Sequence, residues 1–240
     1  MRNERRIPTW CPGCGTYLVN AALKQALKEL KVKDKDVVMS FDIGCSGNMV
    51  NVNDFCSIAT LHGRSIPVAC GVRAVRDDLK VIAQAGDGGL LNEGLNHFIH
   101  AVQRDDDITL LLNNNHVFGL TAGQQSSATP KGETARSAQV ESQFEPLSAV
   151  DLAATTGAKF IARVHEENAP LIKEVLKQAI AFPGFALVEI IQPCKIWAKG
   201  FEKIEYTHLD KRVKESKELI GQHNLTGILF VSKAERKNNG

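Results

Sequence analysis

The chain has 240 residues, of which 43% are apolar and 23% are charged, and its formal net charge is +2 at neutral pH. This composition is ordinary for a globular protein, and the length suits one sizeable core. The sequence contains neither a clustered basic face nor an uninterrupted run of about 18 apolar residues, which argues against nucleic-acid partners and membrane spans. The basic start at residues 1–6 lacks the apolar core of a signal peptide, so we expect a cytoplasmic protein with reduced thiols.

Amphipathic runs alternate with short β-branched runs along the chain. A helix is predicted at residues 17–30, where apolar side chains recur at helical spacing, and a strand follows at 36–41. Further strands are predicted at 80–85, 108–112, 160–164 and 186–191, with helices at 93–103, 147–156 and 169–181. This alternation predicts an α/β fold with a doubly wound, mostly parallel sheet. Ligands of such sheets bind in loops beyond the carboxyl ends of the strands.

A glycine-rich turn, Gly86-Asp87-Gly88-Gly89, follows the strand at 80–85. Glycines let the backbone approach a ligand closely, and the start of the next helix favours a phosphate. A carboxylate among these glycines would repel a diphosphate unless a divalent cation lay between them, so Asp87 suggests Mg²⁺. The next strand ends in three asparagines, and a parallel neighbour would bring Asn115 beside Asp87. The alternative is a plain turn followed by asparagines that cap a strand.

Six cysteines occur in a chain expected to stay reduced, which favours metal or cluster ligation over structural disulfides. Cys11 and Cys14 form a Cys-x-x-Cys pair that suits half a zinc site, a redox pair or part of an iron–sulfur cluster. Cys70 lies in an apolar run and is interpreted as a buried structural thiol, and Cys56 as a core residue.

Several motifs occur together in one order. Gly86-Asp87-Gly88 with Asn115 resembles the thiamine diphosphate motif. More narrowly, the sequences DIGCSG at 42–47, LHGR at 61–64, NHFIHA at 96–101 and FGLTAGQ at 118–124 resemble the β subunit of 2-oxoacid:ferredoxin oxidoreductases. The resemblance extends from about residue 10 to residue 194, so we divide the chain into a cofactor-binding α/β domain at 1–194 and an extension at 195–240. This extension is expected to contact a partner, or else to hold Cys194 in place.

The resemblance also implies which residues form the sites. Thiamine diphosphate would be contacted by Ile43, Gly44, Cys45, Ser46, His62, Gly86, Asp87, Gly88, Asn115, Gly119, Leu120 and Thr121. Mg²⁺ would be held by Asp87, Asn115 and the Val117 carbonyl, and one 4Fe–4S cluster by Cys11, Cys14, Cys45 and Cys194. The substrate would lie near Asn48, Arg64 and Ala122. From the residues alone, four thiolates with no histidine at ligand spacing suit zinc or iron–sulfur equally.

The implied reaction is the oxidative decarboxylation of a 2-oxo acid to acyl-coenzyme A, with electrons passing through the cluster to ferredoxin. We expect no catalytic residue on this chain, because the activating glutamate of the family lies in the pyrimidine-binding domain of a separate α chain, to which a γ part is sometimes fused. The expected protein is therefore a hetero-oligomer. The alternatives are a non-oxidative thiamine diphosphate-dependent decarboxylase subunit with a structural zinc, and a non-catalytic metal-binding scaffold.

Some positions depart from the family pattern. Many members carry a second acid where this chain has Gly89, and basic residues where it has Asn48 and Ala122. The loss of two positive charges would weaken selection of a dicarboxylic acid such as 2-oxoglutarate and favour an apolar 2-oxo acid, unless Arg64 or the partner supplies the charge.

Overall fold

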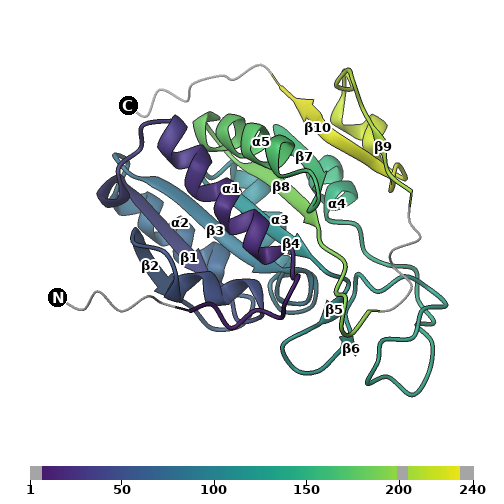
Figure 1. The fold of residues 1–240 in the computed structure, drawn as a ribbon. Coiled ribbons are helices and arrows are strands. Elements are labelled where there is room, and N and C mark those ends of the chain that lie inside the picture. Colours follow the sequence, from purple (N-terminus) through teal and green to yellow (C-terminus); the bar gives the residue numbers. More distant parts are fainter. Residues whose placement is uncertain (1–6, 199–204, 233–240) are drawn as a thin grey trace.

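A computed structural model describes residues 7–198 and 205–232, arranged around one eight-stranded sheet (Figure 1). The strand order is β2-β1-β3-β4-β8-β7-β10-β9, and the first six strands pair in parallel. The strands are β1 (Val37–Phe41), β2 (Cys56–Ala59), β3 (Lys80–Gly86), β4 (Thr109–Asn114), β7 (Phe160–His165), β8 (Ala186–Ile191), β9 (Thr207–His208) and β10 (Leu225–Val231). The predicted basic start and parts of the 195–240 extension (199–204 and 233–240) lie outside the described residues.

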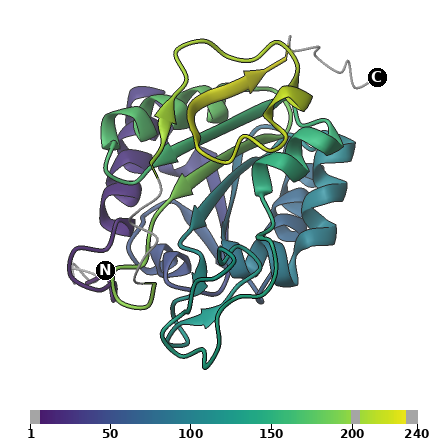
Figure 2. The same cartoon turned by 90° about the vertical axis from the view of Figure 1, so that its right-hand side faces the viewer.

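Helices cover both faces of the sheet, as Figures 1 and 2 show. On one face, α1 (Thr16–Glu29) packs against α5 (Ala169–Ala181), and the other face carries α2 (Ser65–Val75), α3 (Leu95–Arg104) and α4 (Ala149–Thr156). Central strands alternate between the two cores: Leu110 and Leu112 of β4 belong to one, and Leu111 belongs to the other. The predicted doubly wound, mostly parallel α/β class is therefore confirmed.

Local sequence explains where the helices begin and end. The side chains of Ser148 and Asn168 accept hydrogen bonds from the first turns of α4 and α5, and thus cap both helices. Gly157 ends α4 with a positive φ of 89°, a conformation that glycine adopts without steric cost. The helices predicted at 17–30, 147–156 and 169–181 lie within two residues of these observed bounds.

The last strands lie at the far edge of the sheet. β10 pairs antiparallel with β7, and β9 pairs with β10 (Figure 2). The apolar run at 225–231 thus continues the same sheet as the rest of the chain. Whether the extension contacts a partner stays a prediction.

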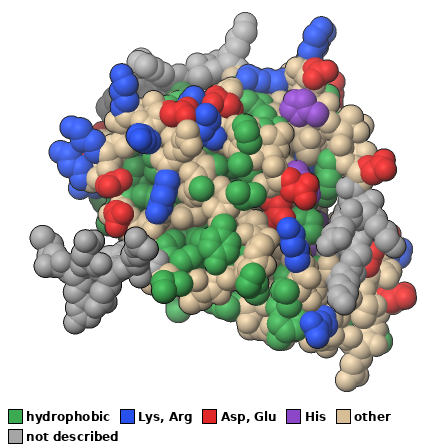
Figure 3. Space-filling view, viewed as in Figure 1, with side chains coloured by type: hydrophobic (Ala, Val, Ile, Leu, Met, Phe, Trp, Pro, Cys, Tyr) green, Lys and Arg blue, Asp and Glu red, His purple; other side chains and the backbone are tan. Residues whose placement is uncertain are grey.

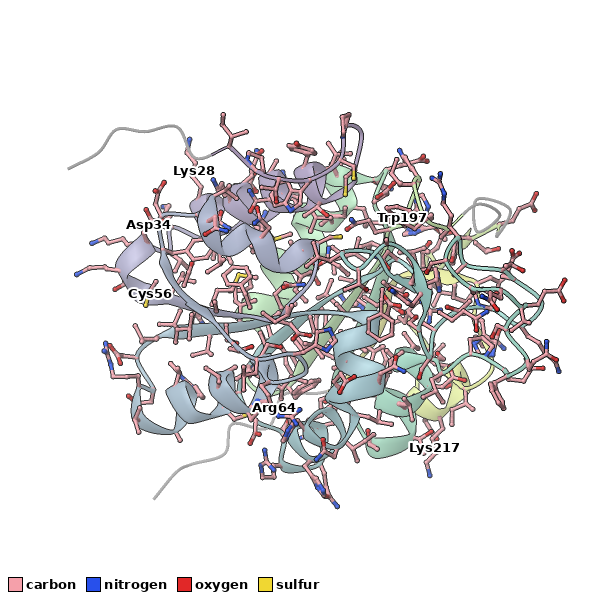
Figure 4. All side chains as sticks on the ribbon, turned by 90° about the horizontal axis from the view of Figure 1, so that it is seen from below. Lys28, Asp34, Cys56, Arg64, Trp197 and Lys217 are labelled. Carbon is pink, nitrogen blue, oxygen red and sulfur yellow. The ribbon has the colours of Figure 1, made fainter. Side chains whose placement is uncertain are left out.

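Two expectations about cysteines differ from the structure. Cys56 was expected in the core but is exposed, because β2 is an edge strand whose side chains have little cover (Figure 4). Cys70 is only half-buried on α2, where its thiol donates a hydrogen bond to Asp106 at 3.1 Å. Burial raises the pKa of the Cys70 thiol to about 12, so it stays protonated.

Candidate functional site

The Gly86–Gly89 turn and the asparagines after β4 meet at the carboxyl ends of two neighbouring strands. β3 and β4 pair in parallel with Gly86 opposite Asn113, so the next residues of both strands lie together. Asp87 is buried, and its Oδ1 accepts a hydrogen bond from the Asn115 backbone N–H at 3.1 Å. The side-chain oxygen of Asn115 in turn accepts from the Val117 N–H at 3.0 Å. The three residues expected at Mg²⁺ are therefore contiguous in space.

The chemistry of this turn fits a divalent cation. The second oxygen of Asp87 accepts a hydrogen bond from the Ser126 hydroxyl, and Ser126 directly follows β6 (Gln124–Gln125), the strand that pairs with β5 (Val117–Phe118). Burial raises the pKa of Asp87 despite these hydrogen bonds. A carboxylate removed from water in this way gains most from a cation beside it. Sequence reasoning did not identify Ser126, because nothing near it in the chain points to Asp87.

One pocket contains all twelve residues expected at thiamine diphosphate, and Gly89, Val117 and Phe118 also line it. Its volume is only about 80 Å³, so this chain supplies a shallow surface rather than an enclosed site. The Gly88 backbone lies against the Phe118 ring, where a Cβ would come within 2.4 Å of the ring carbon Cε1. A side chain at residue 88 would therefore collide with the pocket wall.

Asp42 occupies the space beside Gly89. Gly89 is the position where many members of the family that the motifs resemble carry a second acid. Its Oδ1 accepts hydrogen bonds from the N–H groups of Ile43 (2.8 Å) and Gly63 (2.7 Å), and burial raises the pKa of its carboxyl. A Cβ on Gly89 would lie 1.6 Å from Asp42 Oδ2. Asp42 thus joins the loop after β1, the segment containing His62 and the glycine-rich turn, and it leaves no room for a side chain at 89.

A second cavity, of about 420 Å³, lies beside the first, and all four cysteines expected at the cluster line it: Cys11, Cys14, Cys45 and Cys194. None of them forms a disulfide. The two cavities share a wall that includes Cys45, Asn115 and Gly119. A Cβ on Gly119 would lie 3.3 Å from Cys45 Sγ, so the Gly119 backbone closely approaches this thiol at the shared wall.

Tryptophans hold two of these cysteine loops. The Trp10 indole N–H donates to the Cys45 carbonyl at 2.8 Å, and the Trp197 backbone N–H donates to Cys194 Sγ at 3.4 Å. The Arg136 guanidinium stacks over the Trp197 ring, 5.2 Å from its centre. These contacts tie loops that are distant in sequence into one rim.

Burial disfavours the free thiolate at two of these cysteines, Cys45 and Cys194. Burial, followed by the nearby thiols, raises the pKa of Cys45 to about 12, and burial also raises the pKa of Cys194. Such thiols ionise when metal coordination compensates the burial. Within residues 7–198 and 205–232, no group of three or more His, Cys, Asp or Glu side chains lies close enough to hold a single metal ion.

The three residues expected near the substrate do not come together. Asn48 lines the cysteine cavity, and its side-chain oxygen accepts from the Thr9 N–H at 3.3 Å. Arg64 lines neither cavity, because its guanidinium donates to the Glu93 carbonyl at 2.8 Å, well away from Trp197 in Figure 4. Ala122 also lies outside both linings, in a turn where its φ is 76°.

Comparison with known proteins places this geometry in a family. Residues 42–190 match the family described as "Thiamine pyrophosphate enzyme, C-terminal TPP binding domain". The chain is 38% identical to the 2-oxoacid:ferredoxin oxidoreductase subunit beta of a Sulfolobus species over 85% of this chain and 67% of that protein. It is 33% identical to the 2-oxoglutarate synthase subunit KorB of Archaeoglobus fulgidus, over 90% of this chain and 79% of that protein. This chain belongs to the β subunits of the 2-oxoacid:ferredoxin oxidoreductases.

A solved structure agrees with this assignment. The fold is similar to "2-oxoglutarate:ferredoxin oxidoreductase from Magnetococcus marinus with 2-oxoglutarate, coenzyme A and succinyl-CoA bound", with a TM-score of 0.90 and 28% identity over 98% of this chain and 87% of that chain. The match covers only 58% of subunit beta of 2-oxoacid:ferredoxin oxidoreductase 1 from Aeropyrum pernix, which is 38% identical over 77% of this chain. The family resemblance expected from the motifs is confirmed. In the part of the chain that the structure describes, no helix is long and apolar enough to cross a membrane.

Proposed function

We propose that this chain binds thiamine diphosphate and carries electrons in the oxidative decarboxylation of a 2-oxo acid, with coenzyme A as acyl acceptor and ferredoxin as electron acceptor. One observation carries the proposal: the pocket at Asp87 and the four-cysteine cavity share a wall at Cys45 and Gly119. A short path between two cofactors suits electron transfer. The names of the relatives and of the similar solved structure support the reaction class.

The diphosphate end of the cofactor would lie on the glycine-rich turn. Asp87, Asn115 and the Val117 carbonyl would hold Mg²⁺ against the diphosphate, and Ser126 would keep the Asp87 carboxylate in place. When bound, thiamine diphosphate supplies a nucleophilic carbon that attacks the 2-oxo group. The chain's part is to hold and orient the cofactor beside the cysteines.

The four cysteines would hold one 4Fe–4S cluster. All four line one cavity, and we expect a cluster there rather than a structural zinc, because the reaction needs an electron acceptor beside the thiamine pocket. A cluster supplies one-electron acceptance, which zinc does not.

A partner chain would complete the site, because this chain's thiamine pocket is shallow. Large apolar side chains stand exposed at its mouth: Ile43 is 46% exposed and Leu120 is 61% exposed, and Leu61, next to His62, is 78% exposed. Figure 3 shows hydrophobic side chains gathered over the same lower part of the molecule, where the carboxyl ends of the parallel strands lie in Figure 1. An α subunit with the pyrimidine-binding domain and the activating glutamate would cover this face, and the 195–240 extension would add to the contact.

The substrate side of the site favours an apolar 2-oxo acid. Asn48 is neutral, Ala122 carries no charge, and the Arg64 guanidinium is held by backbone carbonyls outside the cavity. Among the described residues that line the cavity near Asn48, Lys195 is the one basic side chain that would neutralise a second substrate carboxylate. The enzyme would work in the cytoplasm, where ferredoxin is available.

The test is anaerobic purification of the protein with any chain that accompanies it, followed by assays of iron, sulfide, zinc and bound thiamine diphosphate. We expect a brown protein with about four irons and four sulfides per chain. Cys194→Ser should lose the cluster, whereas Cys56→Ser, an exposed thiol on an edge strand, should retain it. A colourless protein that holds zinc would contradict the electron path and favour the non-oxidative decarboxylase. Absence of thiamine diphosphate even with the α chain present would favour the scaffold.

A further inference from the structure

Three buried amide side chains form a line beneath the site. Gln84 of β3, Asn113 of β4 and Gln192, one residue after β8, are 0%, 2% and 4% exposed. The strands β3, β4 and β8 are neighbours in the sheet, and the register places Gln84 opposite Leu111 and Asn113 opposite Ile190. Each amide of the line therefore lies diagonally, two residues further toward the carboxyl ends of the strands than the register partner of the one before. Such buried amides are costly unless their hydrogen bonds are made, so their partners are informative.

The hydrogen bonds along this line all run in one direction. Gln84 Nε2 donates to Asn113 Oδ1 at 3.3 Å, and Asn113 Nδ2 donates to Gln192 Oε1 at 2.8 Å. With its oxygen facing Asn113, Gln192 donates through Nε2 to the Thr16 hydroxyl at 2.6 Å. Asn113 and Gln192 each accept through the oxygen from one neighbour and donate through the nitrogen to the next, so the orientation of Gln192 depends on that of Asn113.

The line ends at a cysteine of the proposed cluster site. Gln192 Nε2 lies 3.5 Å from Cys14 Sγ, and the Thr16 hydroxyl lies 3.2 Å from the same sulfur. Since the Thr16 oxygen accepts from Gln192, its hydrogen is available to the sulfur. At the other end, Gln84 Nε2 donates to Ser46 Oγ at 2.6 Å, next to Cys45. A metal-bound thiolate can only accept hydrogen bonds, so it favours the arrangement in which Gln192 Nε2 and the Thr16 hydroxyl both point their hydrogens at Cys14 Sγ.

We propose that Gln192, held in orientation by Asn113 and Gln84, donates a hydrogen bond to the Cys14 thiolate and raises the reduction potential of the cluster. This inference rests on the proposed function. Hydrogen bonds to cluster sulfurs withdraw negative charge and stabilise the reduced, more negative state. A chain of hydrogen bonds that polarise one another strengthens the last donor. Asn113 and Gln84 are positioning residues, because they touch Gln192 or each other and not the sulfur.

The test is a redox titration of the anaerobically purified holoprotein, followed by electron paramagnetic resonance of the reduced cluster. Gln192→Met keeps a similar volume and removes the donor, so the midpoint potential should shift to a lower value. Asn113→Leu leaves Gln192 in place but frees its orientation, so a smaller shift in the same direction is expected. Both substitutions are uncharged, so neither adds a field of its own. Gln25→Leu, on the exposed face of α1, is the matched control and should leave the potential unchanged.

The outcomes separate this inference from the function on which it rests. If the wild-type protein contains no iron and sulfide, the proposed function fails and the inference fails with it. If the clusters are intact but neither variant lowers the potential, only the inference is overturned. Loss of the cluster in both variants, with the cluster intact in the Gln25→Leu control, would assign the amides a purely structural role and overturn their proposed effect on the reduction potential.

Discussion

Arg163 and Glu189 form a buried ion pair that connects the segment before β10 to the centre of the sheet. Arg163 Nε lies 2.6 Å from Glu189 Oε2, and their side chains are 4% and 1% exposed. The other oxygen of Glu189 accepts from Asn114 at 2.8 Å. Arg163 also donates to the His223 carbonyl at 2.8 Å, just before β10. We expect Arg163→Met to destabilise the protein strongly, because a carboxylate is left buried without its partner.

The magnitude follows from the burial of both groups. Removing one partner of a buried pair costs about 3–5 kcal/mol, and a chain of this size loses about 2–4 °C in Tm per kcal/mol. The Tm of Arg163→Met should therefore fall by roughly 6–20 °C. The double variant Arg163→Met/Glu189→Gln keeps an acceptor for Asn114 but removes the charge, so it should recover most of the loss. Thermal unfolding followed by circular dichroism measures both variants.

The pH dependence of this loss has a definite sign. Burial alone would raise the pKa of Glu189, but the charge and hydrogen bond of Arg163 outweigh it and lower the pKa below its ordinary value of 4.5. The wild-type pair therefore stabilises the fold above that value, and the contribution is lost as pH falls through the lowered pKa. In Arg163→Met the largest influence that lowers the pKa is gone and burial is opposed mainly by the Asn114 hydrogen bond, so the pKa of Glu189 rises and the group is protonated more readily in the folded state. The difference in stability between wild type and variant should shrink on acidification.

Two results would refute this reasoning. A loss below about 1 kcal/mol for Arg163→Met would mean that water reaches the carboxylate and that the pair behaves like a surface pair. A stability difference that grows as pH falls would mean that Glu189 is not the group left unpaired.

Three further substitutions test the packing around the glycine-rich turn and the conformation of helix α2. Gly89→Ala should weaken thiamine diphosphate binding by more than tenfold in calorimetry, because its Cβ meets Asp42 Oδ2 at 1.6 Å. Adding Asp42→Gly should recover part of the affinity, and an unchanged affinity in Gly89→Ala alone would contradict this packing. Ser126→Ala should weaken Mg²⁺ binding by about 10–100-fold, since Ser126 positions Asp87, and an unchanged Mg²⁺ titration would argue against that role. Gly71→Ala should stabilise the protein by about 0.5–1 kcal/mol, since the position is exposed in α2 with no atom within 4 Å of the new Cβ; a lower Tm would be inconsistent with this helix.

Sequence reasoning located the glycine-rich turn and the asparagine beside it because both depend on local pattern and on strand order. A strand followed by Gly86-Asp87-Gly88, and the next strand followed by Asn115, need only parallel neighbours to meet, and β3 and β4 are such neighbours. The helices α1, α4 and α5 followed from apolar spacing and from the alternation of helical runs with strands. Helix α2 and the edge strand β2 were missed, because α2 contains a proline and a glycine and β2 has little apolar pattern.

Only the tertiary structure decided how side chains distant in sequence share space. Asp42 and Gly89 are 47 positions apart, and no local pattern indicates that one carboxylate fills the room beside the other. Arg64 looked available for substrate, yet its guanidinium satisfies the Glu93 carbonyl instead. The line from Gln84 to Cys14 likewise joins four separate segments. The sequence by itself determined most of the elements and the family to which the chain belongs, because periodicity and motif are local. The packing of three-dimensional neighbours decided which polar groups are free to act, because hydrogen bonding and close contact depend on distance in space.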